Sequence, residues 1–275
     1  LLSLTDSRSP LRVAPRLDPD YLRWCWQFLR AARASRVAIA VPALHDLALL
    51  SRRGYEAFTL LWPQGVPLTE HGLLILCRST HALREEHDDA KMARRLGMPV
   101  EILDRDAATA LEPDLDMAIA GAVRYPLDAH VIPQRVVATL VAGLAEAGVE
   151  LRWHTEVVGF RRAESRVAKA VTTTGEIGGD EFVIAAGMWS AALARTIDLP
   201  LPLMSGKGYS FTLAKPRVRP HACALLAEAR IAVTPMGSSL RFAGTMELCG
   251  LDRSIDQRRV AAMIDAIPRY YPQFG

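Results

Sequence analysis

The 275-residue sequence lacks several features that would assign a protein class at once. Its four cysteines are far apart and form no C-x-x-C pair, which argues against a structural zinc site and favours reduced thiols in a cytosolic-type compartment. The formal net charge is only +3 and both signs are scattered, so no nucleic-acid-binding surface is indicated. No run approaches 18 apolar residues, because the best one, Val37 to Leu50, is interrupted by Pro42, His45 and Asp46.

A glycine-rich phosphate loop is also missing. Gly206-Lys207-Gly208 continues with Tyr, Ser and Phe, and the glycines around Gly178 belong to a polar hairpin, so neither fits G-x-G-x-x-G. Either no dinucleotide binds, or its phosphate loop is encoded before Leu1. Because the chain opens on Leu and stops just after a Tyr-Tyr-Pro turn, we expect it to be the central piece of a longer protein.

No metal site and no catalytic nucleophile is predicted. His81 and His87 are six residues apart and do not share a helix face, so a solvated helix surface is expected there. The stretch ending at Ser190 is not G-x-S-x-G, and a helix-turn role suits this serine better.

Apolar periodicity predicts alternating helices and strands. Asp18 as a cap followed by Pro19 predicts a helix start. Further helices are expected over residues 43–61, 81–96, 104–111, 134–147 and 255–267, and strands over 72–76, 149–153, 154–160, 167–173, 176–184, 182–187, 207–213, 225–233 and 240–246. This layout predicts a layered α/β domain with a crossover hairpin around Thr174-Gly175.

The stretch F-V-I-A-A-G-M-W-S, residues 182–190, suggests a close approach to the backbone. Its side chains shrink from Phe182 and Ile184 to Ala185, Ala186 and Gly187 before a helix begins. Small residues at such a point leave space for a ligand, although tight helix–strand packing also needs them.

Three stretches together resemble the D-amino-acid oxidase superfamily of flavoproteins, and most of all its D-amino-acid dehydrogenase (small subunit) branch. They are Ser9 to Arg30, then Thr155-Glu156-Val157 with Phe182 to Ser190, and finally Ser205 to Leu213 with Arg241 to Leu248. Their order and spacing fit that family across the whole chain. The resemblance implies an α/β, FAD-linked fold, with an incomplete FAD-binding layer and a mixed-sheet substrate domain with helices. Residues 1–130 and 201–275 would form the substrate domain, and 131–200 the middle part of the FAD-binding domain.

The resemblance also implies which residues contact FAD. The backbone at Val157 would meet the adenine, and Ala185, Ala186 and Gly187 would let the cofactor come close. Trp189 would line the flavin edge, and a core or interface tryptophan is the alternative.

Substrate contacts are expected where the chain re-enters the substrate domain. Lys207 would attract a substrate carboxylate or favour an anionic reduced flavin, and Tyr209 would shape the pocket; a turn with an exposed lysine is the alternative. Arg241, Thr245 and Glu247 alternate on one strand and should share a face, where Arg241 would pair a carboxylate.

Two polar residues, Asp128 and His130, precede the helix expected at 134. Asp128 suits a cap or turn, and His130 is an alternative neighbour of the cofactor.

The implied reaction is oxidation of a D-amino acid to an imino acid by hydride transfer to flavin N5, followed by hydrolysis to a 2-oxo acid and ammonia. Electrons would pass to a quinone or another acceptor. The alternatives are a glycine- or sarcosine-type flavin amine oxidase, or a non-catalytic fragment that lacks the pyrophosphate loop. The expected location is cytoplasmic, with peripheral attachment to the inner membrane through the helix bearing Trp24, Trp26 and several arginines as an option. The oligomeric state is not predicted.

Overall fold

The computed structural model describes residues 11–13 and 18–274. The chain divides into two compact units, each discontinuous in sequence. The sheet unit comprises residues 1–14, 34–141 and 206–275, and the hairpin unit comprises residues 15–33 and 142–205. The assignment of substrate-binding and FAD-binding domains to residue ranges stays a prediction.

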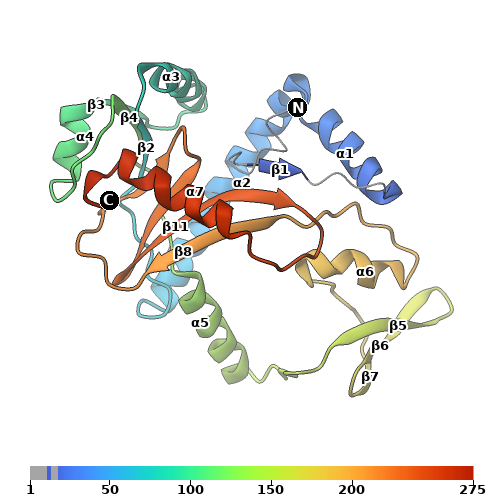
Figure 1. Ribbon diagram of the computed structural model, residues 1–275. Coiled ribbons are helices and arrows are strands. Elements are labelled where there is room, and N and C mark those ends of the chain that lie inside the picture. The colour runs from blue at the N-terminus through green and yellow to red at the C-terminus, as the bar shows by residue number, and fades with distance from the viewer. Residues whose placement is uncertain (1–10, 14–17, 275) are drawn as a thin grey trace. The chain divides into compact units, whose positions relative to one another are not determined.

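The sheet unit is built on an eight-stranded mixed sheet with the order β1-β11-β10-β9-β2-β4-β3, in which β8 also pairs with β11 (Figure 1). Most neighbours are antiparallel, but β1 with β11 and β2 with β9 are parallel. The strands are β1 (Leu11–Val13), β2 (Leu73–Cys77), β3 (Glu101–Asp104), β4 (Gly121–Tyr125), β8 (Lys207–Leu213), β9 (Cys223–Leu226), β10 (Ile231–Met236) and β11 (Ser239–Leu248).

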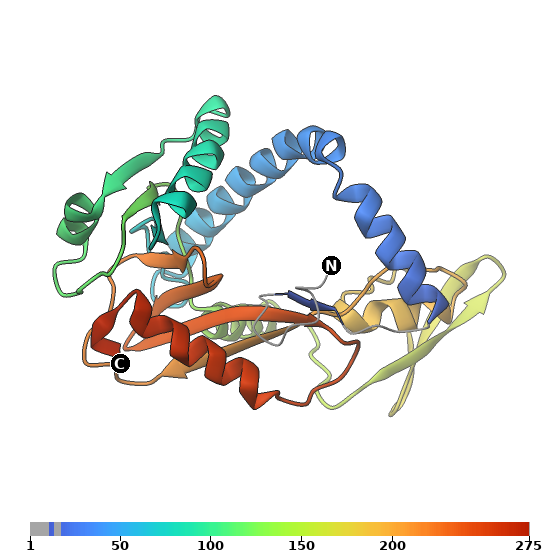
Figure 2. The ribbon, with the colours of Figure 1, turned by 45° about the horizontal axis from the view of Figure 1, so that its top comes forward.

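Helices cover different parts of the two faces of this sheet. Alternate residues of β2 point to opposite sides, so Leu74 and Leu76 join one core cluster while Ile75 and Cys77 join another. The first cluster includes Met263 of α7 (Gln257–Ala266), which lies across β8 and β11 in Figures 1 and 2. The second cluster packs β2 and β4 against α3 (Thr80–Arg95).

The remaining elements are α4 (Arg105–Leu111), α5 (Pro133–Glu146), which crosses the boundary between the units, and the short turns η3 (Ile267–Arg269) and η4 (Pro272–Phe274).

One long helix stands out for its exposure. α2 (Ala34–Leu61) begins nine residues before the predicted start and contains Pro42 inside it. By length and composition it is the one described helix that meets the criterion for crossing a membrane. None of the most apolar 18 residues of α2 are buried. Because core helices of soluble proteins meet the same criterion, it does not by itself assign α2 to a membrane.

The hairpin unit contains a three-stranded antiparallel sheet and two helices. Its strands are β5 (Val157–Ala163), β6 (Arg166–Thr172) and β7 (Gly175–Gly178), in that order. The helices are α1 (Pro19–Ala31) and α6 (Ser190–Arg195), preceded by the turn η2 (Gly187–Trp189). An ion pair of 2.6 Å between Arg195 and Asp20 joins the two helices.

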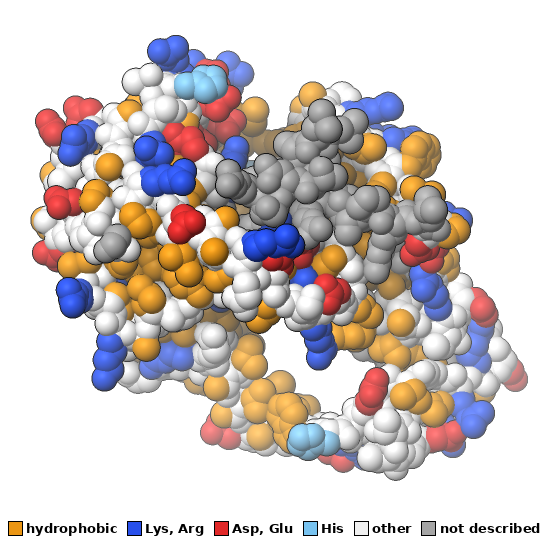
Figure 3. Space-filling view, in the orientation of Figure 1, with side chains coloured by type: hydrophobic (Ala, Val, Ile, Leu, Met, Phe, Trp, Pro, Cys, Tyr) orange, Lys and Arg blue, Asp and Glu red, His pale blue; other side chains and the backbone are white. Residues whose placement is uncertain are grey.

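Four predicted strands are wrong. Residues 149–153 and 182–187 form no strand, 176–184 is reduced to β7, which ends at Gly178, and 225–233 is two strands, β9 and β10, separated by a turn. The first two carry strand-like patterns, but no described strand pairs with them. Figure 3 shows hydrophobic side chains gathered at the surface after α5, where Val149 and Trp153 are exposed. The pattern alone does not make a strand, because the backbone also needs a partner for its hydrogen bonds.

Candidate functional site

The predicted cofactor-binding stretch is an open, irregular segment of the hairpin unit. Residues 181–186 are in neither helix nor strand, and Val183 is 91% exposed. Ala186 precedes η2, and Trp189, half exposed, ends it just before α6. The small-residue tip is therefore not covered by the unit's own side chains.

Gly187 supplies a direct test of whether FAD fits here. Its φ of +54° lies in the left-handed region, and a Cβ built on it would meet no atom within 4 Å. Ala185 is exposed beside it, whereas Val157 opens β5 in register with Thr172. An open backbone free of bulky side chains suits close approach by a cofactor. The FAD contacts of Val157, Ala185, Ala186, Gly187 and Trp189 stay predictions.

In the sheet unit, Lys207 and Tyr209 belong to a charged cluster around the buried Glu247. Both lie on β8, and both contact Glu247, which is 4% exposed: Lys207 Nζ lies 3.1 Å from its Oε2, and the Tyr209 hydroxyl donates to Oε2 at 2.7 Å. Arg259, 1% exposed on α7, brings its Nε to 3.6 Å from Glu247 Oε1, and Asp252 lies 3.2 Å from Lys207. We call these five residues the Glu247 cluster.

The Glu247 cluster keeps Lys207 charged. Partial burial alone would lower the pKa of this lysine, but its contacts with Glu247, Tyr209 and Asp252 outweigh burial and raise it. The ammonium group therefore already has two carboxylate partners, so a substrate carboxylate would have to compete with both.

The prediction that Arg241, Thr245 and Glu247 share a face is wrong because β11 contains a β-bulge. Gly244 pairs with Tyr209 and Met246 with the next residue along, Gly208, so the register of the ladder shifts by one residue at Thr245. Its φ of +50° is left-handed, which is unusual for a β-branched residue. The extra residue turns Glu247 to the buried side and leaves Arg241 on the other.

Arg241 lies on a partly open face of the sheet. Its register partners are Thr212 and Thr234, and its Nη2 donates to Ser210 Oγ at 3.1 Å. Among the described residues the guanidinium has no other hydrogen-bond partner. The next position on this face is the small Ala243, so there is room beside the arginine. This arrangement can bind a carboxylate, and the substrate role of Arg241 stays a prediction.

His130 and Cys223 form a pair that the sequence did not indicate. His130 makes an isolated β-bridge with Thr69, and its Nε2 donates to the carbonyl of Pro235 at 2.8 Å. Because Nε2 carries the proton, Nδ1 is free to accept from Cys223 Sγ at 3.1 Å. Burial raises the pKa of Cys223 to about 11 and lowers that of His130, because it disfavours the charged form of each group. Nearby, Asp128 occupies a turn through its N–H to the carbonyl of Tyr125, in agreement with the turn prediction.

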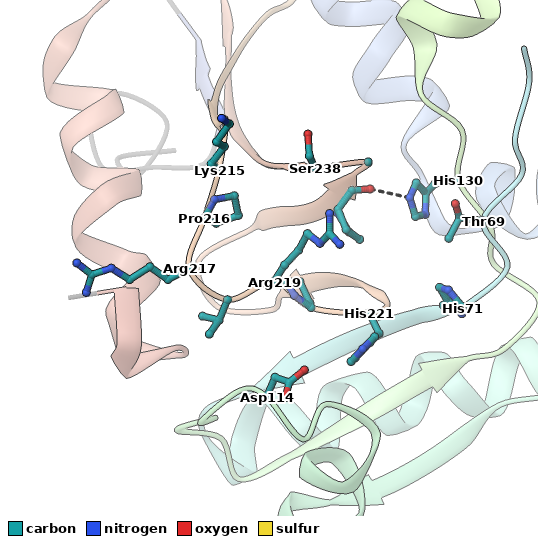
Figure 4. Close-up of a pocket in the computed structure, with 14 residues that line it drawn as sticks. Thr69, His71, Asp114, His130, Lys215, Pro216, Arg217, Arg219, His221 and Ser238 are labelled. Carbon is teal, nitrogen blue, oxygen red and sulfur yellow. Dashed lines mark hydrogen bonds between the residues drawn. The ribbon is translucent and has the colours of Figure 1, made fainter. Parts of the chain in front are cut away.

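A cavity of about 830 Å³ opens at the end of the sheet next to this pair (Figure 4). It is framed by the β8–β9 loop, the β10–β11 turn and the segment before β2. The polar residues lining it are Thr69, His71, Asp114, His130, Lys215, Arg217, Arg219, His221 and Ser238. Within the part of the chain that the structure describes, no group of three metal-ligating side chains comes together.

The chain matches the family model described as FAD dependent oxidoreductase (DAO) over residues 20–275. It therefore belongs to the DAO family of FAD-dependent oxidoreductases, as the sequence resemblance predicted, and its cofactor is FAD.

Relatives and solved structures agree on the family and the fold. A D-amino acid dehydrogenase of Vibrio atlanticus (strain LGP32) is 27% identical over 99% of this chain and 66% of its own length. D-amino acid dehydrogenase 2 of Mesorhizobium japonicum is 32% identical over 89% of this chain and 60% of its own length. Glycine oxidase from Bacillus cereus superposes with a TM-score of 0.76 at 20% identity, over 84% of this chain and 64% of that one. The α/β fold with a mixed sheet and helices is confirmed. The chain spans about two thirds of the length of these curated relatives.

Proposed function

We propose that the protein catalyses the FAD-dependent oxidation of D-amino acids to 2-oxo acids and ammonia and passes the electrons to a quinone or another acceptor. The observation that carries the proposal is the match to proteins named D-amino acid dehydrogenase along nearly all of this chain. When bound, FAD supplies the hydride acceptor, and water hydrolyses the imino acid that results.

The chain's own residues would bind and orient the reactants. In the hairpin unit, Ala185, Ala186 and Gly187 leave the backbone accessible to FAD. In the sheet unit, Arg241 is our candidate for the substrate carboxylate, because its guanidinium has a single hydroxyl partner whereas Lys207 is held between two carboxylates. An oriented carboxylate fixes the position of Cα, which is most of what a flavin-dependent oxidation requires of the protein.

The test uses the intact flavoprotein that contains this chain, mixed anaerobically with a panel of D-amino acids, L-amino acids, glycine and sarcosine. Bleaching of the flavin absorption by D-amino acids alone is the expected result. Faster bleaching by glycine or sarcosine would favour an amine oxidase of that type, and a protein without bound flavin would favour a non-catalytic product. Arg241→Gln should raise KM for the D-amino acid by about tenfold or more. Arg84→Gln, on the exposed side of α3, is the matched control.

We also propose that the protein is cytoplasmic and rests on the inner face of the membrane through α1. Leu22, Trp26 and Leu29 are 54%, 57% and 69% exposed and recur at helical spacing, and Arg30 lies over the Trp26 ring at 4.5 Å. Sedimentation with anionic vesicles should fall in Trp26→Gln, while neutral vesicles should bind weakly. Equal sedimentation of both proteins would refute the attachment.

A further inference from the structure

The cavity at the end of the eight-stranded sheet is rich in cations and lies wholly within the sheet unit. Its β8–β9 loop reads Lys215-Pro-Arg217-Val-Arg219-Pro-His221, with a basic or imidazole side chain at every second position. Asp114 is the acidic residue on its wall. The lining is therefore positive overall, with three permanent cations against one carboxylate.

The three cations of the loop make no contacts of their charged groups that would stabilise the described fold. Lys215, Arg217 and Arg219 have no hydrogen bond or ion pair with any residue that the structure describes. In Figure 4, Arg219 extends into the space in front of His130, whereas Arg217 points away from it. Arg219 is thus the cation placed to meet a ligand inside the cavity.

Hydrogen bonds hold the two walls of the cavity beside Arg219 in place. Buried Glu112 accepts the N–H groups of His221 at 2.7 Å and Ala222 at 2.8 Å, which anchors the end of the loop. On the opposite wall, His130 is bonded to the carbonyl of Pro235. Pro220, directly after Arg219, limits the backbone further, and Val218, directly before it, packs against the core. A preorganised site loses less entropy when it binds.

The cavity offers hydrogen-bond donors around this cation. Hydroxyl groups of Thr69 and Ser238 and the ring of His71 line the same space. Guanidinium, hydroxyl and imidazole groups together suit an oxyanion, and a guanidinium binds phosphate or carboxylate with two parallel hydrogen bonds. The volume of about 830 Å³ is that of a small-molecule site and exceeds what a bare ion needs.

We propose that this cavity binds a small molecule bearing a compact dianionic group, either a phosphate ester or a pair of carboxylates, with Arg219 as its main contact. The proposal concerns the sheet unit alone and does not depend on the oxidation described above.

The experiment measures binding of inorganic phosphate and of succinate to the full chain by calorimetry, at constant ionic strength set with chloride. We expect saturable binding of at least one of the two, which also tells a phosphate site from a dicarboxylate site. Arg219→Gln should weaken it by about tenfold or more, since a hydrogen bond to a charged group is lost. Arg84→Gln, an exposed arginine on α3 without a described partner, should leave binding unchanged.

Circular dichroism and thermal melts establish that the variants are folded. If Arg219→Gln does not fold, Lys215→Gln, which changes an exposed side chain of the same loop, replaces it in the binding measurement. No saturable signal from either probe would overturn the proposal. So would an equal loss in Arg84→Gln, because the attraction would then be a diffuse charge effect without a site.

Discussion

The Glu247 cluster allows one stability prediction to be worked out in detail. Glu247→Gln keeps the size of the side chain and an oxygen that accepts from the Tyr209 hydroxyl, so the main change is the loss of one negative charge. That charge faces Arg259, which is 1% exposed, and Lys207 at 3.1 Å. Removing one member of a buried ion pair leaves the other charge uncompensated and costs about 3–5 kcal/mol. Folded domains are stable by only about 5–15 kcal/mol, so this loss is a large fraction of the free energy of unfolding and should be easy to measure.

The assay is urea unfolding followed by circular dichroism and by tryptophan fluorescence, because a chain with two compact units need not unfold in one step. We expect the transition of the sheet unit to move to lower urea concentration by the equivalent of about 3 kcal/mol. The matched control is Asp252→Asn, which removes the exposed carboxylate 3.2 Å from the same lysine and should change little. A loss below about 1 kcal/mol in Glu247→Gln, or an equal loss in the control, would show that the cluster does not work by compensating a buried charge.

Three further changes should act at separate points of the sheet unit. Burial lowers the pKa of His130, so the folded state binds fewer protons at this residue than the unfolded state does. The free energy of unfolding should therefore decrease as the pH falls below about 6.5, the pKa of histidine in the unfolded chain. His130→Gln should flatten this part of the curve of stability against pH. Glu112→Ala leaves the Ala222 N–H without its acceptor and should cost about 1–3 kcal/mol in urea unfolding; no loss would show that water replaces the carboxylate. In Gly121→Ala the new Cβ would lie 2.7 Å from the backbone carbonyl oxygen of Leu103, so β3 must shift away; we expect a lower melting temperature, and an unchanged one would contradict the strand register.

Local features of the structure followed from local sequence. Asp18 accepts the N–H of Asp20 with Pro19 at the first position of α1, as the Asp-Pro pattern predicted. The turn before Gly175 joins β6 and β7, because a glycine there can take its φ of +131°. The family resemblance was likewise readable from three stretches of sequence, since it depends on residue order alone.

The errors arose where distant residues decide the outcome. Residues 182–187 look like a buried strand, but an extended segment becomes a strand only when another backbone pairs with it. The face that Glu247 occupies depends on the bulge at Thr245, which is visible only from the pairing with β8. No periodicity within β11 predicts the bulge, because a register shift of one residue moves every side chain that follows to the opposite face of the sheet.

The sequence by itself determined where most helices and strands lie and to which family of flavoproteins the chain belongs, because propensity, capping and residue order act over short stretches. Only the tertiary structure decided which of those residues meet. It placed Cys223 beside His130, 93 positions away, and it joined the cations of the β8–β9 loop to a cavity walled by segments from across the sheet unit. Such contacts depend on the order and register of the strands, and no short stretch of sequence encodes either of these.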